Sequence, residues 1–310
     1  MSLKNSTATL KLNTGAEIPV VGLGTWRSAA NDGYDSVLAA LKLGYRHIDA
    51  AAIYGNEDQV GRAIKDSGVP RQEIFITTKL WGTEHRNPAK ALDSSLKRLG
   101  LDYVDLYLMH WPVALKAHGS EEKDLLNIPK KPDGKTDIDI EDWDFIKTWE
   151  LMQELPKTGK TKAIGVSNFS INNLKALKNS PKFNTVPAVN QVEIHPLFPQ
   201  TELIEYCKSE NILIEAYSPF GSADAPVLKE PELHKLAEKY NISTAQLIIS
   251  WSVQRGYVVL PKSVHAERIE ANLKVLTLKD EDMETITNLS KVKGEKRLVQ
   301  LDWSPFPTFE

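Results

Sequence analysis

The chain has 310 residues, of which 41% are hydrophobic, and a formal net charge of −3 at pH 7. A chain of this length can bury a large core, and α/β barrels of this size fold as one domain, so we expect a single domain over residues 1–310. The slightly acidic balance excludes a basic surface for nucleic acid or an anionic membrane and favours a small-molecule partner.

The number of cysteines and the hydropathy of the chain indicate where in the cell the protein is located. Cys207 is the only cysteine, so the chain can form no intramolecular disulfide. Residues 1–11 are polar and lack the apolar run of a signal peptide, and no stretch approaches the ~18 apolar residues of a membrane span. We expect a cytoplasmic protein.

The predicted elements begin with a β-hairpin and continue as alternating strands and helices. Residues 9–12 and 17–19 flank a turn and predict a hairpin that caps the floor of a barrel. Apolar, β-branched runs then alternate with amphipathic segments, which is the pattern of βαβ units in a parallel sheet. Eight runs predict strands: residues 21–25, 47–50, 74–80, 104–110, 163–168, 189–194, 213–219 and 258–263. The pattern predicts a (β/α)8 TIM barrel.

Other segments predict a helix, a long loop and a tail. Residues 88–99 carry apolar side chains on one face and predict a helix that Gly100 ends. Residues 112–142 are too long for an ordinary barrel loop, and residues 291–310 follow the last helix with no strand to join. We expect these segments and the loop at 220–230 to lie at the C-terminal face and to shape a pocket.

Active sites of (β/α)8 barrels are built at the carboxyl ends of the strands, where this chain places Asp49, Lys79 and His110, with Tyr54 just beyond. A free tyrosine has a pKa near ~10, and a nearby ammonium lowers that pKa. Lys79 would supply the ammonium, Asp49 would keep it charged, and His110 would hydrogen-bond a carbonyl oxygen. The four residues predict a general-acid site for carbonyl reduction.

The side chains offer no hydride donor, so this chemistry requires a nicotinamide cofactor. The Tyr217 ring can stack on a nicotinamide, and Ser167, Asn168 and Gln191 have the donors and acceptors to fix its carboxamide.

The last predicted strand ends in a cluster that suits a phosphate group. Lys262, Ser263 and Arg268 supply two cations and a hydroxyl. These groups suit the 2′-phosphate that distinguishes NADPH from NADH, so we predict NADPH as the cofactor.

Three motifs resemble those of the aldo/keto reductase superfamily. They are residues 44–57 (GYRHIDAAAIYGNE), 101–112 (LDYVDLYLMHWP) and 260–264 (LPKSV). Residues 145–174 resemble the fungal glycerol dehydrogenase and keto-ester (carbonyl) reductase group of that family. The resemblance implies Tyr54 as general acid, Lys79 and Asp49 as the pair that tunes it, and His110 as the residue that orients the carbonyl.

The resemblance also implies ligand contacts. NADPH would contact Gly24, Thr25, Trp26, Asp49, Ser167, Asn168, Gln191, Tyr217, Ser218, Ser222, Lys262, Ser263, Val264, Arg268 and Asn272, and the substrate would contact Trp26, Tyr54, Trp81, His110, Trp111 and Trp303. The chain departs from the pattern at Arg27, Ala50 and Ala271, and the last of these weakens the expected contact with adenine.

Several other interpretations compete. His47 is expected to be structural, on the barrel floor, and we expect surface or packing roles for His85, His118, His195, His234 and His265. No His-x-His or His-Glu-x-x-His pair occurs, which disfavours a metal site and a metal-dependent hydrolase. Residues 22–27 lack the third glycine of a Rossmann fingerprint, which argues against a Rossmann dinucleotide site. No tyrosine has lysine four residues later, so the chain lacks the Tyr-x-x-x-Lys helix of the other major class of carbonyl reductases.

The remaining alternative for function is a catalytically weak NADPH-binding protein with a regulatory or structural role on the same barrel. The three indoles of Trp26, Trp81 and Trp111 can also be packed side chains and not pocket walls. No long apolar surface stripe is present, so we expect a monomer or weak dimer.

Overall fold

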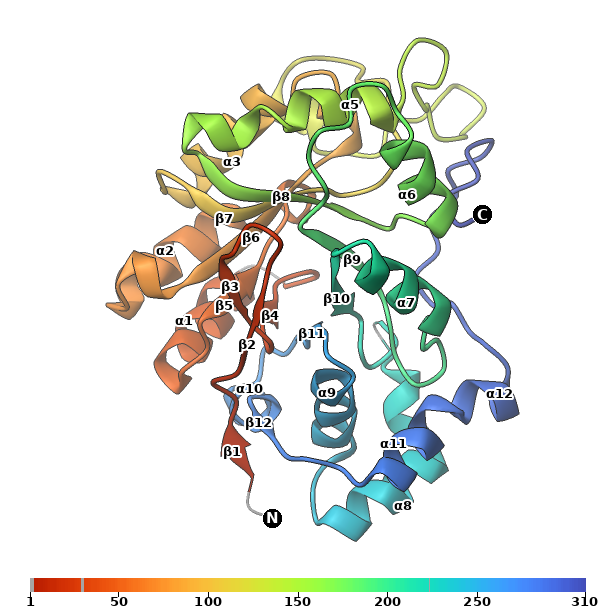
Figure 1. Cartoon of the computed structure of the whole chain (residues 1–310). Coiled ribbons are helices and arrows are strands. Elements are labelled where there is room, and N and C mark those ends of the chain that lie inside the picture. Colours follow the sequence, from red (N-terminus) through yellow and green to blue (C-terminus); the bar gives the residue numbers. More distant parts are fainter. Residues whose placement is uncertain (1–2, 29–30, 223) are drawn as a thin grey trace.

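A computed structural model describes residues 3–28, 31–222 and 224–310, and its centre is a barrel of parallel strands (Figure 1). Eight strands form one sheet in which each pairs with the next along the chain. The sheet closes on itself, because the Gly22 and Gly24 N–H groups donate to Val259 O and Pro261 O, both at 3.0 Å. The barrel strands are β4 (Leu23–Gly24), β5 (His47–Asp49), β6 (Phe75–Leu80), β7 (Val104–Met109), β8 (Thr161–Ser167), β9 (Val189–Glu193), β10 (Leu213–Tyr217) and β11 (Val258–Leu260).

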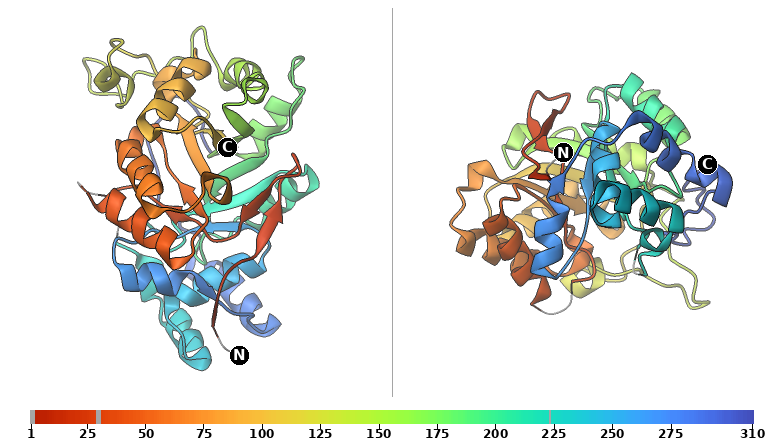
Figure 2. Two further views of the ribbon diagram at one scale, coloured as in Figure 1. Left: turned by 90° about the vertical axis from the view of Figure 1, so that its left-hand side faces the viewer. Right: turned by 90° about the horizontal axis from the view of Figure 1, so that it is seen from below.

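Helices surround the barrel, as the two views of Figure 2 show, and a helix follows every barrel strand. They are α1 (Asp32–Leu43), α2 (Glu57–Ser67), α3 (Pro88–Leu99), α4 (Glu122–Leu125), α5 (Phe145–Met152), α6 (Ile171–Lys178), α7 (Thr201–Ser209), α8 (Pro231–Tyr240), α9 (Thr244–Gln254), α10 (Ala266–Asn272), α11 (Asp280–Thr287) and α12 (Leu289–Lys293). The predicted (β/α)8 fold is confirmed.

All eight predicted strands form at the expected places; most end one residue before the predicted end, whereas the last two end two and three residues early. β10 stops before Pro219 and β11 before Pro261. A proline has no N–H to donate to a sheet, so the ladder ends there. The barrel strands are buried along nearly their whole length, because helices cover the outside and side chains fill the inside.

The helix α3 has the predicted bounds, and local contacts at its two ends explain why it begins and ends there. The Asn87 side chain accepts a hydrogen bond from Lys90 N at 3.2 Å, which caps the N-terminus. Gly100 takes the left-handed conformation at φ 64° and donates to Leu96 O and Lys97 O. Both ends are therefore fixed by local chemistry.

The N-terminal hairpin closes the floor of the barrel, as predicted. Its strands β2 (Thr9–Lys11) and β3 (Glu17–Pro19) are antiparallel and lie in front of the barrel in Figure 1. Leu12 and Ile18 are buried against Phe75 and Val258, which begin β6 and β11. A further pairing that the sequence did not predict joins β1 (Lys4–Asn5) to β12 (Lys274–Val275).

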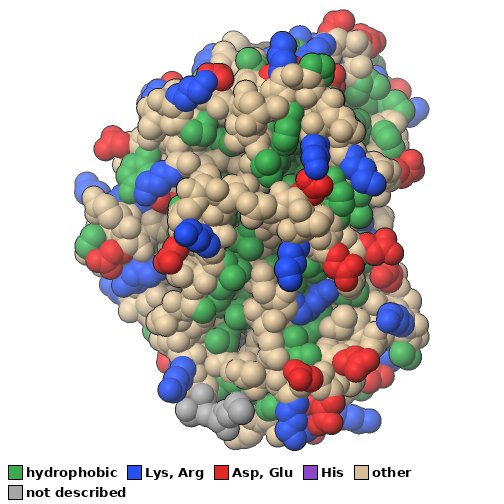
Figure 3. Space-filling model, viewed as in Figure 1, with side chains coloured by type: hydrophobic (Ala, Val, Ile, Leu, Met, Phe, Trp, Pro, Cys, Tyr) green, Lys and Arg blue, Asp and Glu red, His purple; other side chains and the backbone are tan. Residues whose placement is uncertain are grey.

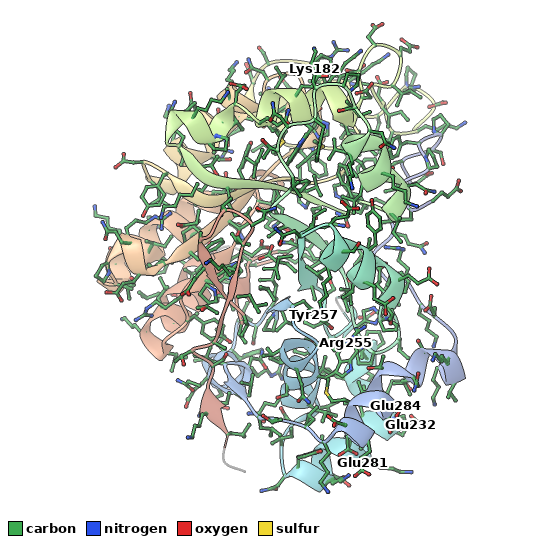
Figure 4. The ribbon with its side chains drawn as sticks, in the orientation of Figure 1. Lys182, Glu232, Arg255, Tyr257, Glu281 and Glu284 are labelled. Atoms are coloured by element: carbon green, nitrogen blue, oxygen red, sulfur yellow. The ribbon has the colours of Figure 1, made fainter. Side chains whose placement is uncertain are left out.

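Arg255 fixes the turn that leads from α9 into β11 (Figure 4). Its guanidinium carbon lies 4.7 Å from the Trp251 ring centroid and 5.5 Å from that of Tyr257, and its Nη1 donates to Pro199 O at 2.9 Å. These contacts hold the start of the strand whose other end carries Lys262.

The outer surface carries charges of both signs, which are interspersed on the face seen in Figure 3. Within the described residues, no helix combines the length and the apolar character that crossing a membrane requires.

Candidate active site

A cleft of about 1210 Å³ opens where the barrel strands end. Pockets for small ligands measure ~300 to 1,000 Å³, so this one has room for a cofactor and a substrate together. Of the residues predicted for the site, the cleft is lined by Gly24, Trp26, Asp49, Tyr54, Trp81, His110, Trp111, Ser167, Asn168, Gln191, Tyr217, Ser218, Ser222, Lys262, Ser263, Val264, Arg268 and Asn272. Thr25, Lys79 and Trp303 lie behind this lining.

Lys79 lies beneath the centre of the site and contacts Asp49, Ala50 and Tyr54. Its Nζ lies 2.9 and 2.7 Å from the two Asp49 carboxylate oxygens, 2.8 Å from Ala50 O and 3.4 Å from the Tyr54 hydroxyl. The side chain is fully buried, and the opposing effect of its burial is outweighed by Asp49 and Tyr54, which raise the pKa of Lys79. The ammonium is therefore charged at neutral pH, and it uses the backbone of Ala50, a position where the sequence departs from the family pattern.

The structure corrects the expected direction of the Tyr54 pKa. Burial raises the pKa of the Tyr54 hydroxyl above its ordinary value, and Lys79 opposes that effect without overcoming it. Lys79 thus offsets the cost of removing a proton from a buried phenol. At neutral pH Tyr54 holds its proton and has a cation beside it to stabilise the phenolate.

His110 faces Tyr54 across the cleft, with ring centroids 5.7 Å apart. Burial and the Lys79 charge hold the pKa of His110 well below its ordinary value. The ring is therefore neutral at pH 7 and can donate a hydrogen bond without serving as a proton source. Of these two residues, Tyr54 is therefore the one that can act as the general acid.

A second buried carboxyl group, Glu215, lies under the site and was missed by the sequence analysis. Gln191 Nε2 donates to Asp49 Oδ1 at 2.8 Å and to Glu215 Oε2 at 3.0 Å. Both amide hydrogens point away from a ligand, so Gln191 can offer a ligand only its oxygen. A signal that could have identified Glu215 is its position as a lone carboxylate in residues 213–219, a run otherwise typical of a buried strand.

The floor side of Glu215 is occupied by His47. The Nε2 atom of His47 lies 3.5 Å from Glu215 Oε1, and Nδ1 lies 3.2 Å from Pro19 O in the hairpin. Burial, reinforced by Asp49, raises the pKa of Glu215 to about 8, and burial lowers the pKa of His47 to about 4. Both groups are therefore largely uncharged near neutral pH, and His47 lies on the floor as predicted.

The residues predicted to hold a nicotinamide are locked to one another. The Tyr217 hydroxyl donates to Asn168 Oδ1 at 2.7 Å, and Asn168 Nδ2 donates to His110 O at 2.9 Å. Asn168 and Ser218 adopt φ values of 62° and 49°, a region that most side chains avoid. Backbone strain of this kind concentrates at functional sites.

The predicted phosphate cluster lies at the end of β11. Lys262 Nζ donates to Arg27 O at 3.3 Å, and Ser263 Oγ accepts from His265 N at 3.1 Å. Within residues 3–28, 31–222 and 224–310, no carboxylate lies within ion-pair distance of Lys262 or Arg268. Two cations at a cleft without such partners fit an anionic ligand group.

Beyond the phosphate cluster, the cleft includes two histidines that the sequence analysis assigned to surface or packing roles. His234 and His265 both line it, together with Thr244 and Ala271. Both are exposed, which is compatible with the predicted surface or packing roles, but nothing in their local sequence shows that they face the cleft. The prediction of packing holds for His85 and His195, which are buried.

Three tryptophans form a layered wall on the substrate side. Trp81 and Trp111 line the cleft, and Trp303 packs behind them with ring centroids 6.2 and 5.6 Å away. Trp303 therefore supports the wall and does not face the cleft. The tail predicted to shape the pocket does line the cleft, but with Leu298, Val299, Gln300 and Leu301, which the sequence analysis did not single out.

The long loop at residues 112–142 supports the same wall. It is partly ordered by the bridges Leu115↔Ile138 and Lys130↔Thr136 and by α4. Trp81 Nε1 donates to Asn127 O at 2.6 Å, so the loop fixes an indole of the cleft.

In the parts of the chain that the structure describes, no group of three or more His, Cys, Asp or Glu side chains could hold a metal ion.

Comparison with known proteins agrees with this geometry. Residues 20–291 match the aldo/keto reductase family. The chain is 68% identical to aldehyde reductase YPR1 of Saccharomyces cerevisiae and 64% identical to glycerol 2-dehydrogenase (NADP(+)) of the same yeast; each alignment covers 100% of this chain and 99% of the relative. D-galacturonate reductase of Hypocrea jecorina is 47% identical over 93% of this chain and 94% of its own length.

A solved structure shows the same fold. The aldose reductase from Schistosoma japonicum superposes with a TM-score of 0.84 and 37% identity, over 92% of each chain. Together with the family match and the parallel barrel, these similarities show that the chain is an oxidoreductase that belongs to the aldo/keto reductase family.

Proposed function

We propose that the protein reduces aldehydes and ketones to alcohols with a hydride from NADPH and a proton from Tyr54. The observation that carries the proposal is the ammonium of Lys79, which lies 2.7 Å from Asp49 and 3.4 Å from the Tyr54 hydroxyl beside a neutral His110. This arrangement holds one proton on a phenol at the cleft and stabilises the charge that its departure creates.

The described residues fit NADPH along the whole cleft. Gln191 has only its oxygen free for a carboxamide, and the Tyr217 ring is held in place by the hydrogen bond of its hydroxyl to Asn168. Lys262 and Arg268 lie where a cofactor phosphate would need cations. The relative named glycerol 2-dehydrogenase (NADP(+)) supports the same cofactor.

In the proposed mechanism the chain supplies everything except the hydride, which NADPH supplies when bound. His110 donates a hydrogen bond to the carbonyl oxygen and holds it near the Tyr54 hydroxyl. Tyr54 then transfers its proton to that oxygen as negative charge develops there. Lys79 stabilises the resulting phenolate, and Asp49 keeps Lys79 charged and in place.

The substrate end of the cleft is apolar and aromatic, with Trp26, Trp81, Trp111 and Leu301 among its walls. Such walls favour aldehydes and ketones with an apolar or aromatic group beside the carbonyl. The names of the relatives extend the range to polar carbonyl compounds derived from glycerol and sugar acids.

The test is loss of NADPH absorbance with an activated aromatic aldehyde, in the purified wild type, in Tyr54→Phe and in Tyr206→Phe. We expect turnover in the wild type, a fall in kcat of about 10²- to 10⁴-fold in Tyr54→Phe, and wild-type kcat for Tyr206→Phe, whose phenol lies on α7 away from the cleft. Wild-type kcat in Tyr54→Phe would refute the assigned role. Tight NADPH binding without turnover would favour the regulatory alternative.

The proposal includes a cytoplasmic monomer or weak dimer. Light scattering during size-exclusion chromatography measures the mass directly. A stable tetramer at micromolar concentration would contradict this part of the proposal.

A further inference from the structure

The tail that walls the substrate pocket has no secondary structure of its own. After α12 ends at Lys293, no helix or strand occurs in residues 294–310, which the structure describes completely. Yet Leu298, Val299 and Leu301 line the cleft. A segment without the hydrogen bonds of a helix or a sheet keeps its position mainly through contacts with the rest of the molecule, so those contacts determine the shape of the pocket.

Glu193, at the end of β9, makes the most specific of these contacts. Its Oε1 accepts from Leu298 N at 2.8 Å and from His195 Nε2 at 2.9 Å, and its Oε2 accepts from Val299 N at 2.9 Å. The carboxyl group is fully buried. One carboxylate thus binds two consecutive tail N–H groups, one with each oxygen.

Arg297 adds a second attachment next to the first. Its guanidinium carbon lies 4.5 Å from the Phe198 ring centroid and 3.5 Å from that of Phe309. The Lys296 N–H donates to Leu197 O at 2.9 Å. The tail is therefore held from residue 296 to residue 299, where the part that faces the cleft begins.

The attachment also reaches the cofactor side of the cleft. Glu193 pairs in register with Tyr217 of the neighbouring strand. The Leu298 side chain packs on Gly221, where an added Cβ would lie 2.7 Å from Leu298 Cδ1 and where φ is +87°. The tail is thus fixed against the loop that follows Tyr217, and its position depends on two strand ends.

We propose that Glu193 is a positioning residue that fixes the tail wall and thereby sets how tightly bulky carbonyl substrates bind. This inference rests on the proposed function, since it concerns the substrate pocket of the same site. The Glu193 carboxylate does not line the cleft, and it acts through residues 298–301. A small aldehyde that does not reach these residues is indifferent to Glu193, whereas an aromatic substrate that packs on them depends on it.

The variants Glu193→Gln and Glu193→Ala test the proposal, because the amide can accept only one of the two tail N–H bonds and alanine can accept neither. Asp105→Asn is a control at another buried carboxylate: Asp105 accepts a backbone N–H from Ile76 at 3.0 Å and also pairs with Arg71 and Lys162, and it lies on β7 near the floor. Val299→Pro is a second route that removes one donor from the tail and leaves the barrel unchanged.

Three quantities are measured: steady-state KM and kcat for an aromatic and a small aliphatic aldehyde, the Kd of NADPH, and the rate of tryptic cleavage after Lys296 and Arg297. Loss of hydrogen bonds to a buried charged acceptor should raise the aromatic KM and the cleavage rate about ten-fold or more in Glu193→Ala and Val299→Pro. In Glu193→Ala, the small-aldehyde KM and kcat and the NADPH Kd should stay within about three-fold, as they should in Asp105→Asn.

Unchanged cleavage in Glu193→Ala and Val299→Pro would overturn the attachment. Faster cleavage with an unchanged aromatic KM would overturn its role in substrate binding. An inactive wild type would instead refute the proposed function, while the cleavage rates would still test the attachment. If Glu193→Ala fails to fold, Val299→Pro gives the same three readings.

Discussion

The catalytic end of the cleft and its tail wall are built by different means. Lys79 and Asp49 belong to adjacent strands of a closed sheet, and three of the four short contacts of the Lys79 ammonium measure 2.9 Å or less. Residues 298–301 have no secondary structure and depend on contacts with Glu193 and Arg297. The difference suggests that the chemistry is fixed by the barrel, while substrate choice can change through the tail without cost to the chemistry.

The comparison predicts its largest effect for Lys79→Met. This variant leaves the Asp49 carboxylate buried without its partner, so the free energy of unfolding should fall by about 3 to 5 kcal/mol. Removing the ammonium beside Tyr54 should also lower kcat by about 10²- to 10⁴-fold. Urea unfolding and steady-state kinetics measure the two effects, with the exposed Lys157→Met as control. A kcat within three-fold of wild type would show that the barrel end does not fix the chemistry.

Lys262→Met and Arg268→Met should have the next largest effect, on cofactor binding alone. Each removes a cation from the cleft, so the Kd of NADPH should rise about 10- to 100-fold, as expected for a lost charge-assisted hydrogen bond. The Kd of NADH, which has no 2′-phosphate, should change by less than about three-fold. Equal weakening of both cofactors would contradict the assignment of these cations to the 2′-phosphate.

Glu215→Gln should change how stability depends on pH. The pKa of Glu215 is about 8 in the folded protein against 4.5 for an ordinary glutamate, so between these values the folded state keeps a proton that the unfolded chain has lost. Stability from this group is therefore full at low pH and is lost as pH rises through 8.

The cleanest window for Glu215→Gln is pH 7 to 8, because His47, with a pKa of about 4 in the fold and an ordinary value of 6.5, is then mostly neutral in the folded and unfolded states alike. Wild-type stability should fall there by at most about 1.4 kcal/mol per pH unit because of Glu215, and the variant should lose that slope. Urea unfolding at several pH values measures it. Parallel profiles for the two proteins would show that Glu215 is already ionised in the folded state.

Arg297→Met should have the smallest effect and bears on the tail alone. It removes a guanidinium that stacks on Phe309 and Phe198, a contact worth roughly 0.5 to 2 kcal/mol. We expect the aromatic-aldehyde KM to rise a few-fold with kcat unchanged. A fall in kcat comparable to that of Lys79→Met would mean that the two ends of the cleft are coupled.

The sequence by itself determined the barrel, because the signals for it are local. Strand runs, the proline that ends β11 and the glycine that ends α3 act within a few residues of themselves. Since barrel strands end at one face, the same pattern placed Asp49, Lys79 and His110 together. The single-domain organisation and the roles of these residues stay predictions.

Only the tertiary structure decided which buried groups meet across the barrel and how they titrate. Glu193 and the tail are about a hundred residues apart in sequence, and Glu215 reaches Asp49 only through Gln191. The sign of the Tyr54 pKa shift, the place of Trp303 behind the wall and the exposure of His234 to the cleft depend on the same long-range packing. No periodicity or cap encodes such contacts, because burial and distance between remote segments exist only once the sheet has closed.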